Sequence, residues 1–256
     1  RLGVAITGRV DKAGVWYAVN QETLTEINAS PIAKSFDDTI GPATIINDAA
    51  AATLAEAHFG SGRGCQNFGY ITVSTGVGGG LFLGGRLHQS INGVAGHIGF
   101  TTSSRGTQMC GSGRHGTVES VAGGNAIKRA AKELGYSTFD ARDVFARAAE
   151  NVSWAVAIVD ESAHSIAELC ANLTTTLGLD AVAIGGSIGM AEGYLERIQE
   201  HSNRLPPIFQ TRLTRASLGD DGPLLGAPAV EESMELADQF RPVDEEEDAH
   251  GHLEDL

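Results

Sequence analysis

The pair Asn47-Asp48 stands where a β-branched run, TIIND, meets an alanine-rich stretch, AAAATLAEAHFG. This order predicts a strand that ends at the start of a helix, and in open α/β sheets such strand ends face a cleft. A carboxylate placed there is stabilised by the helix dipole and can accept a proton from a hydroxyl held against it. Asn and Asp are also ordinary helix caps, so the pair has a purely structural interpretation as well.

Two glycine-rich turns could approach a phosphate. In Ser74-Thr75-Gly76-Val77-Gly78-Gly79-Gly80, consecutive glycines expose backbone N–H groups and Thr75 adds a hydroxyl donor. This run is not a Walker A loop, because no Gly-Lys-Ser/Thr follows, and a tight hairpin turn is the structural alternative. The second turn, Gly185-Gly186-Ser187, follows an apolar strand, where glycines would let a ring or a phosphate pack against the backbone.

A third glycine-rich region, residues 93–119, carries His97, Cys110, His115 and Glu119. Histidine and cysteine in one loop are typical of a zinc site, but zinc takes four ligands, and one cysteine with two histidines falls short of that number. A structural loop without metal is therefore the favoured interpretation.

These motifs need an α/β framework to position them. Apolar runs predict strands at residues 2–7, 15–19, 44–48, 68–74, 81–87, 180–187 and 209–218. Alanine-rich or amphipathic stretches predict helices at residues 49–60, 118–134, 140–149, 152–178, 189–203 and 221–240. Strands that alternate with helices indicate an α/β protein. Residues 180–204 loosely repeat the pattern of residues 68–80, which a duplicated two-lobe architecture would produce.

The chain is acidic, with 32 Asp and Glu against 18 Lys and Arg and a net charge of −14 over 256 residues. It is a poor candidate for non-specific binding to nucleic acid or to anionic membranes. Residues 240–256 are acidic and poor in apolar side chains, so we expect a solvated tail. Three widely spaced cysteines favour a reducing cytoplasm over a disulfide framework. No signal peptide is visible.

In this order and spacing, the motifs resemble the ROK family of sugar kinases. The likeness runs over most of residues 1–238, in the segments IINDAAAATLAEA, ITVSTGVGGGL, GVAGHIGF, CGSGRHGTVESVAGG and VAIGGSIGMAEGYL. It implies an α/β, two-lobed actin-like or ribonuclease H-like ATPase fold, with most of the N-terminal lobe missing. The family's phosphate-gripping turn, Asp-x-Gly-Gly-Thr, is expected before Arg1, and a chain without that turn is expected to be inactive by itself.

The resemblance also divides the chain into parts. Residues 1–47 would be the remnant of an N-terminal lobe, and residues 48–225 the C-terminal lobe that binds sugar and nucleotide. Residues 226–240 would form a C-terminal helix that returns toward the N-terminal lobe. Residues 241–256 would be an acidic disordered tail.

Within the family, the sugar loop is most similar to that of the bacterial N-acetylmannosamine kinases. Most ROK glucokinases carry Gly-Glu-Ile-Gly-His, whereas this chain carries Gly96-His97-Ile98-Gly99-Phe100, with the His at the Glu position that is typical of the N-acetylmannosamine enzymes. In VNQETL, Asn20 and Leu24 match the family's Asn-Pro-x-Asn-Leu, but Thr23 replaces the second Asn. The resemblance implies ATP-dependent phosphorylation of the 6-hydroxyl of N-acetyl-D-mannosamine, in sialic acid catabolism.

The family's zinc motif falls on Phe100, Cys110, Ser112 and Thr117, of which only Cys110 is a usual zinc ligand. Phe, Ser and Thr cannot replace imidazole and thiolate ligands. We therefore expect no zinc, unless His115 and another side chain rebuild a site. The loop would then hold its shape by packing, with Phe100 as a plug.

The resemblance implies a role for each candidate residue. Asp48 would be the catalytic base that accepts the proton of the attacking hydroxyl. The substrate-binding residues would be Gly8, Asn20, Asn47, His97 and Glu119. The ATP-binding residues would be Thr75, Gly76, Val77, Gly78, Gly185 and Gly186. ATP would be the second substrate, with Mg²⁺ held by its phosphates and by water. Family members are commonly dimers, so we expect a homodimer.

Two other functions remain open. One is a ROK glucokinase or another hexokinase of the same family, against which His97 is the main argument. The other is a ROK sugar-responsive transcriptional repressor with a helix-turn-helix ahead of the sugar domain. Such repressors often keep the zinc motif and lose parts of the nucleotide site. This chain shows the reverse pattern, which favours a kinase.

Overall fold

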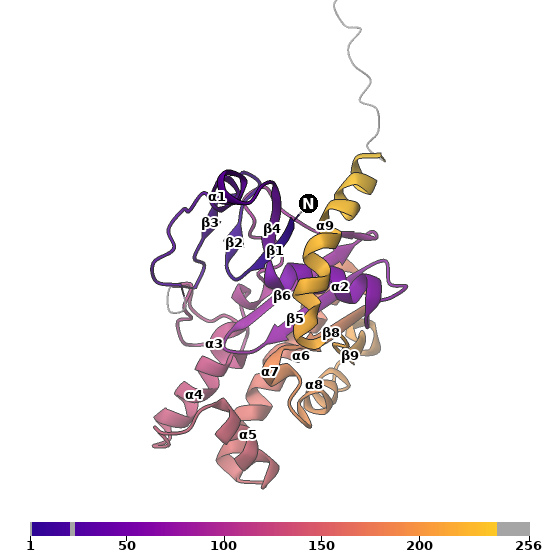
Figure 1. Ribbon diagram of the computed structural model, residues 1–256. Coiled ribbons are helices and arrows are strands. Elements are labelled where there is room, and N and C mark those ends of the chain that lie inside the picture. Colours follow the sequence, from indigo (N-terminus) through magenta and orange to yellow (C-terminus); the bar gives the residue numbers. More distant parts are fainter. Residues whose placement is uncertain (1, 21–23, 240–256) are drawn as a thin grey trace, which may run out of the picture.

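The computed structural model describes residues 2–20 and 24–239, so Thr23 and the expected tail lie outside the described residues. The central element is a mixed sheet in the order β7-β6-β5-β8-β9 (Figure 1). Its strands are β5 (Phe68–Val73), β6 (Val77–Leu83), β7 (Arg86–Leu87), β8 (Ala181–Gly185) and β9 (Arg212–Arg215). Since β5, β8 and β9 are parallel, their carboxyl ends share one edge of the sheet.

Helices cover both faces of this sheet, because alternate strand residues point to opposite sides. Ile71, Val73 and Val182 lie in one apolar core, whereas Phe68 and Tyr70 lie in the other. The first core is covered by α6 (Ser153–Leu177) and α8 (Tyr194–Ser202), and the second by α2 (Asp48–Phe59) and α9 (Gly222–Gln239). None of the described helices has the length and apolarity needed to cross a membrane.

The N-terminal strands lie beside α9 and above the large sheet in the view of Figure 1. They are a parallel pair, β1 (Leu2–Ile6) and β4 (Ala43–Asn47), and an antiparallel pair, β2 (Arg9–Val10) and β3 (Trp16–Tyr17), with α1 (Ile32–Thr39) before β4. The register pairs Ile6 with Asn47. The next residues, Thr7 and Asp48, are therefore brought together where the two strands end.

Short helices complete the fold. They are α3 (Glu119–Ala122), α4 (Gly124–Glu133), α5 (Ala141–Ala149) and α7 (Gly186–Gly189), with 3₁₀ turns η1 (Ile98–Phe100), η2 (Pro207–Phe209) and η3 (Gly219–Asp221).

Three expectations about these elements were wrong. The helix expected over residues 118–134 is broken at Gly123, whose backbone is extended (ψ 155°). The helix expected over residues 189–203 begins only at Tyr194, as α8, because Gly189 is the last residue of α7. Of the glycine run at residues 75–80, most lies in β6 and only residues 74–76 form the turn.

Candidate active site

A cavity of ≈ 400 Å³ lies where the ends of β1 and β4 face the β5–β6 hairpin and the loop before η1. It brings together most of the residues that the sequence singles out, although they are far apart in the chain. The predicted residues that line it are Gly8, Asn20, Asn47, Asp48, Thr75, Gly76, Val77, Gly78, His97, Phe100 and Glu119.

Asp48 is the first residue of α2, and hydrogen bonds fix both oxygens of its carboxylate. Oδ1 accepts from the Ala49 backbone N–H at 2.8 Å and from Asn47 Nδ2 at 3.0 Å. Oδ2 accepts from Thr7 Oγ1 at 2.7 Å. The positive end of the helix dipole adds a favourable interaction with the negative charge. The carboxylate therefore lines the cavity in a fixed orientation.

Asn47 orients Asp48 and caps α2. Its Oδ1 accepts a hydrogen bond from the Ala50 backbone N–H at 3.0 Å, as an N-cap side chain does. Its Nδ2 donates to Asp48 Oδ1 and, at 2.9 Å, to the Gly8 carbonyl oxygen. Both amide hydrogens are thus used within the protein, and the predicted contact of Asn47 with substrate would have to come from the remaining lone pair of Oδ1.

Gly8 must be glycine for two reasons. Its φ of +101° lies in a region that side chains disfavour, and an added Cβ would lie 2.8 Å from the Tyr17 carbonyl oxygen. This backbone conformation lets the Gly8 carbonyl reach Asn47.

Thr7 belongs to the site but is absent from the sequence-based predictions. Its hydroxyl donates to Asp48 Oδ2, the oxygen that Asn47 does not contact. The signal that could have found it is a hydroxyl residue directly after the first apolar strand, at the same sheet edge as Asp48. That signal becomes useful only when the parallel register of β1 and β4 is known.

Glu119, at the start of α3, joins the hairpin turn to the N-terminal segment. Its Oε2 accepts from the Val77 backbone N–H at 3.1 Å, and its Oε1 accepts from Asn20 Nδ2 at 3.2 Å. A Cβ on Gly76 would lie 2.3 Å from Glu119 Oε2, so a side chain at position 76 would displace this carboxylate. The cavity thus has a second carboxylate besides Asp48.

His97 lines the cavity, and one of its ring nitrogens is left as a hydrogen-bond acceptor. Its Nδ1 lies 3.1 Å from the Val94 carbonyl oxygen, which can only accept, so Nδ1 carries the proton. Burial lowers the pKa of His97 below its usual 6.5, so the ring is neutral near pH 7. Nε2 then has a free lone pair, and it is buried without a hydrogen-bond partner among the described residues. A donor on a ligand would satisfy it.

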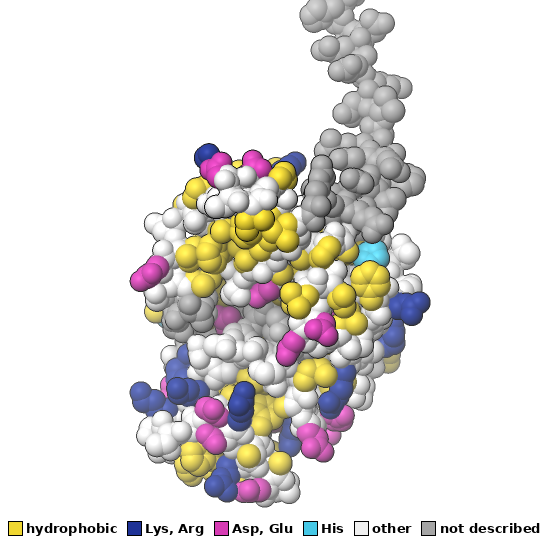
Figure 2. Space-filling view, viewed as in Figure 1, with side chains coloured by type: hydrophobic (Ala, Val, Ile, Leu, Met, Phe, Trp, Pro, Cys, Tyr) yellow, Lys and Arg dark blue, Asp and Glu magenta, His cyan; other side chains and the backbone are white. Residues whose placement is uncertain are grey.

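A second cavity, of ≈ 620 Å³, shares Ser74 and Thr75 with the first. Lys128 and Arg142 are among its lining residues, and Figure 2 shows Lys and Arg mainly on the lower half of the face in view, over α4, α5 and α8. Cationic side chains of this kind favour polyphosphate. The other lining residues are Gly124, Asn125, Asp140, Ala141, Phe145, Ser187, Ile188 and Ala191.

Gly185 and Gly186 line neither of these two cavities, although the next residue, Ser187, lines the second. Both glycines have a packing role. A Cβ on Gly185 would lie 2.6 Å from the Tyr70 hydroxyl, and one on Gly186 would lie 2.4 Å from the Val73 carbonyl oxygen. Their predicted contact with ATP stays a prediction.

The positions of the family's zinc ligands do not make a metal-ligand set. Cys110 Sγ lies 3.0 Å from Ser112 Oγ, Thr117 is fully buried, and the Phe100 ring stacks on His97 with centroids 6.1 Å apart. In the part of the chain that the structure describes, no group of three or more His, Cys, Asp or Glu side chains could hold a metal ion. The donors present therefore do not fit zinc.

The sequence and the fold of this chain are similar to those of several known sugar kinases. An N-acetylmannosamine kinase from Haemophilus influenzae is 39% identical over 230 residues, which cover 88% of this chain and 75% of that protein. The solved ROK hexokinase from Thermus thermophilus is 32% identical, with a TM-score of 0.82 over 92% of this chain and 79% of that one. A ROK family glucokinase from Streptomyces griseus, in complex with glucose and AMPPNP, is 25% identical, with a TM-score of 0.77 over 90% and 81% of the two chains.

These likenesses confirm the predicted fold class, an α/β protein of the actin-like ATPase type. The model of the ROK family matches residues 1–233. With a family match over nearly all of the described residues, and a relative at 39% identity over most of the chain, the conclusion is direct: the chain belongs to the ROK family.

Proposed function

We propose that the protein is an ATP-dependent kinase that phosphorylates the 6-hydroxyl of N-acetyl-D-mannosamine. The observation that carries the proposal is the Asp48 carboxylate, fixed by Thr7, Asn47 and the start of α2 in a cavity that adjoins a second, cationic one. The first cavity would hold the sugar and the second the nucleotide. Their shared residues, Ser74 and Thr75, mark where the transferred phosphate would lie. The N-acetylmannosamine kinases among the relatives support the choice of sugar.

The chemistry needs little more than this arrangement. Phosphoryl transfer passes through a loose transition state, so the protein mainly positions groups and stabilises charge. Asp48 Oδ2 would accept the proton of the sugar 6-hydroxyl as its oxygen bonds to the γ-phosphorus of ATP. The bond from that phosphorus to the β–γ bridging oxygen breaks, and ADP leaves with the electron pair. The Thr7 hydroxyl, 2.7 Å from Oδ2, would keep that oxygen in place.

The remaining polar groups of the first cavity would bind the sugar. Glu119 would accept hydrogen bonds from hydroxyls at the anomeric end, with Asn20 holding its Oε1 in position. His97 Nε2 would accept one from a hydroxyl or from the acetamido N–H. Gly8 and Asn47 would act mainly through Asp48, because their hydrogen bonds converge on it.

The hairpin turn would receive the γ-phosphate through the Thr75 hydroxyl and the backbone from Gly76 to Gly78. The Val77 N–H already donates to Glu119, so it would act indirectly. Lys128 and Arg142 would bind the other phosphates, and Gly185 and Gly186 would stay on the adenosine side. ATP oxygens and water would hold Mg²⁺, which neutralises phosphate charge. A cytoplasmic homodimer, and the division into lobes at residue 47, remain part of this proposal.

The test is the isosteric substitution Asp48→Asn in the intact protein. We expect phosphorylation in a coupled ADP assay to fall by about a thousandfold, as general-base catalysis would be lost. Sugar binding, measured by calorimetry, should persist because the amide keeps the shape of the site. The control is Glu196→Gln, which should retain full activity. Glu196 is exposed on α8 and pairs with Arg215 of β9. Normal turnover by Asp48→Asn would remove Asp48 as the base.

A hexose is the second candidate substrate, because the ROK hexokinase from Thermus thermophilus is 32% identical to this chain. A panel of hexoses and N-acetylhexosamines in the same assay separates the two candidates. Comparable kcat/KM for glucose and N-acetylmannosamine would contradict the proposed specificity. A repressor function is disfavoured by the cationic second cavity beside the Asp48 site.

A further inference from the structure

Residues 101–118 form a loop between two residues of the candidate sugar site, His97 and Glu119, and the two ends of this loop are tied together. The Ser103 N–H donates to the Gly116 carbonyl at 2.9 Å, and the Val118 N–H donates to the Thr101 carbonyl at 2.9 Å. Thr102 and Thr117 form an antiparallel bridge between these bonds. A contact that fixes Ser103 therefore fixes the chain on both sides of the loop.

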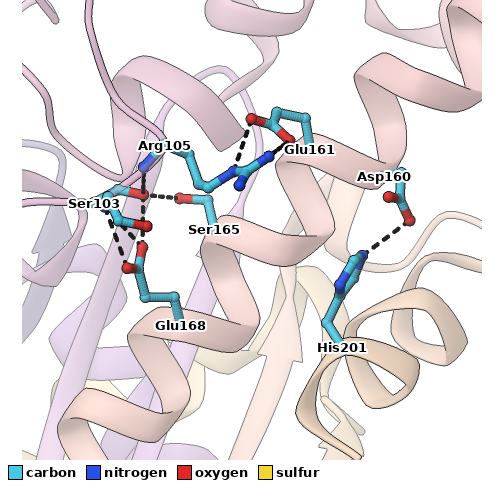
Figure 3. Close-up of polar contacts among 8 residues, drawn as sticks. Ser103, Arg105, Asp160, Glu161, Ser165, Glu168 and His201 are labelled. Carbon is cyan, nitrogen blue, oxygen red and sulfur yellow. Dashed lines mark hydrogen bonds and ion pairs between the residues drawn. The ribbon is translucent and has the colours of Figure 1, made fainter. Parts of the chain in front are cut away.

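Helix α6 supplies such a contact (Figure 3). Ser103 Oγ donates to Glu168 Oε2 at 2.8 Å, and the Ser104 backbone N–H donates to the same oxygen at 3.0 Å. Ser165 Oγ donates to Ser103 Oγ at 3.0 Å. Ser103 is 2% exposed and Ser165 is fully buried, so the bond between them is shielded from water, whereas Ser104 is exposed and Glu168 is half-buried. One carboxylate thus accepts hydrogen bonds from two consecutive loop residues.

The charge on Glu168 strengthens the contact. Burial by itself would raise the pKa of Glu168, but the hydrogen bonds from Ser104 and Ser103 outweigh burial and hold its pKa below the usual value. Charge-assisted hydrogen bonds are about twice as strong as neutral ones. Arg105 adds a second tie, through Nε and Nη2 to the Glu161 carboxylate, but this pair is partly exposed and contributes little.

We infer that Glu168 is a positioning residue of the sugar site, which clamps Ser103 and Ser104 to α6 and thereby fixes His97 and Glu119. It does not line the cavity itself. This contact matters because the loop carries Cys110, Ser112 and Thr117, which cannot together bind a metal ion. The loop must therefore be ordered by contacts with other parts of the protein. The kinetic part of this inference rests on the proposed function, whereas the structural part does not.

The test is Glu168→Gln in the intact protein, because the amide removes the negative charge and replaces one of the two accepting oxygens with an N–H₂ donor. We expect the sugar KM to rise about tenfold, while kcat and the KM for ATP stay within about twofold. Ser165→Ala, which removes one neutral hydrogen bond, should raise the sugar KM in the same direction by less. The control variant Glu196→Gln changes an exposed glutamate on α8, and it should alter none of these values.

Hydrogen exchange separates this inference from the proposed function. In Glu168→Gln, amides of residues 101–118 should exchange faster, while those of β5 and β8 should keep their protection. If the unmodified protein phosphorylates no sugar, the proposed function fails and the exchange result alone decides whether the clamp exists. Unchanged exchange with unchanged KM would overturn the inference, and so would an equal loss of protection throughout the sheet. If Glu168→Gln does not fold, Ser165→Ala is judged by the same measurements.

Discussion

The hydrogen bond and the burial of the His97 imidazole determine the protonation state of its two ring nitrogens. The bond to the Val94 carbonyl sets the tautomer, and burial keeps the ring neutral, so that Nε2 is left as a buried acceptor without a partner among the described residues. A glutamate at this position would also accept hydrogen bonds, but it would bring a charge that burial penalises.

Sugar affinity should therefore fall in acid. Burial lowers the pKa of His97 below 6.5, so the neutral form dominates above that value and is lost only as the pH falls through the lowered pKa. Protonation turns Nε2 into a donor and adds an unpaired buried charge. We expect a sugar KM that is constant above pH 6.5 and rises on the acid side, in assays between about pH 8 and pH 5.

His97→Gln provides the control for this pH dependence. A glutamine amide can still accept a hydrogen bond but does not titrate, so the rise of KM in acid should disappear. A rise that persists in this variant would assign the titration to another group of the cavity.

Its position at a predicted strand end made Asp48 a candidate, whereas the resemblance to the ROK family implied the roles of His97 and Glu119. Asp48, His97 and Glu119 carry titratable groups beside glycines or at element ends, and all three line one cavity. Sequence patterns did not predict Thr7 or Lys128 as site residues, since a threonine after a strand and a lysine on an amphipathic helix are common. Their roles depend on the register of β1 with β4 and on the approach of α4 to the hairpin turn.

At the scale of elements, α2 is held at its far end by a buried carboxylate. Glu56 is 1% exposed and accepts hydrogen bonds from Ser61, Ser217 and Leu218, through both backbone and hydroxyl donors. Burial alone would raise the pKa of Glu56, but these hydrogen bonds hold it below its usual 4.5. Because α2 begins at Asp48, this carboxylate fixes the helix that carries the proposed base.

Glu56→Gln should lower the free energy of unfolding by about 1–3 kcal/mol at neutral pH, because backbone donors would face an amide N–H₂ group. The stabilisation by the carboxylate is present above the pKa of the unfolded state and is lost as the pH falls through the lowered native pKa. The unfolding free energies of the two proteins, measured in urea, should thus converge below pH 4.5. A constant difference down to strong acid would contradict this account.

Hydrophobic patterning predicted most of the strands and helices, but it did not predict β2, α1 or the breaks between elements. The first two residues of α4, Gly124 and Asn125, donate their backbone N–H groups to the carbonyls of Ser74 and Thr75, which lie in another part of the chain. Gly79 is likewise explained by packing, since an added Cβ would lie 2.4 Å from the Ile98 side chain. Such contacts join residues that are far apart in the chain, so a local sequence pattern cannot predict them.

At the scale of the whole molecule, α9 joins the N-terminal strands to α2 through close backbone contacts. A Cβ on Gly226 would lie 1.8 Å from the Ala51 carbonyl oxygen, and one on Gly3 would lie 2.5 Å from the Ala227 backbone. Glycine at these positions lets α9 pack directly on α2 and β1. The assignment of residues 226–240 to a helix that returns toward an N-terminal lobe stays a prediction.

Gly226→Ala should lower the stability of the protein, although replacing glycine with alanine in a helix usually raises stability. In an exposed helix interior, alanine is more stable than glycine by about 1 kcal/mol. Here the methyl group would force α9 away from α2, with a loss of about 1–3 kcal/mol and a fall in Tm of about 5 °C by calorimetry. Gly222→Ala in the same helix is the control, because its Cβ would meet Ala52 at an ordinary 3.4 Å. Equal melting temperatures for the two variants would disprove tight packing at Gly226.

Ser74 and Thr75 line both cavities, and this shared wall has a thermodynamic consequence. A sugar that shifts the hairpin turn changes the affinity for nucleotide by some factor, and nucleotide must then change the affinity for sugar by that same factor. The two dissociation constants, each measured with and without the other ligand, close a cycle with a single coupling free energy.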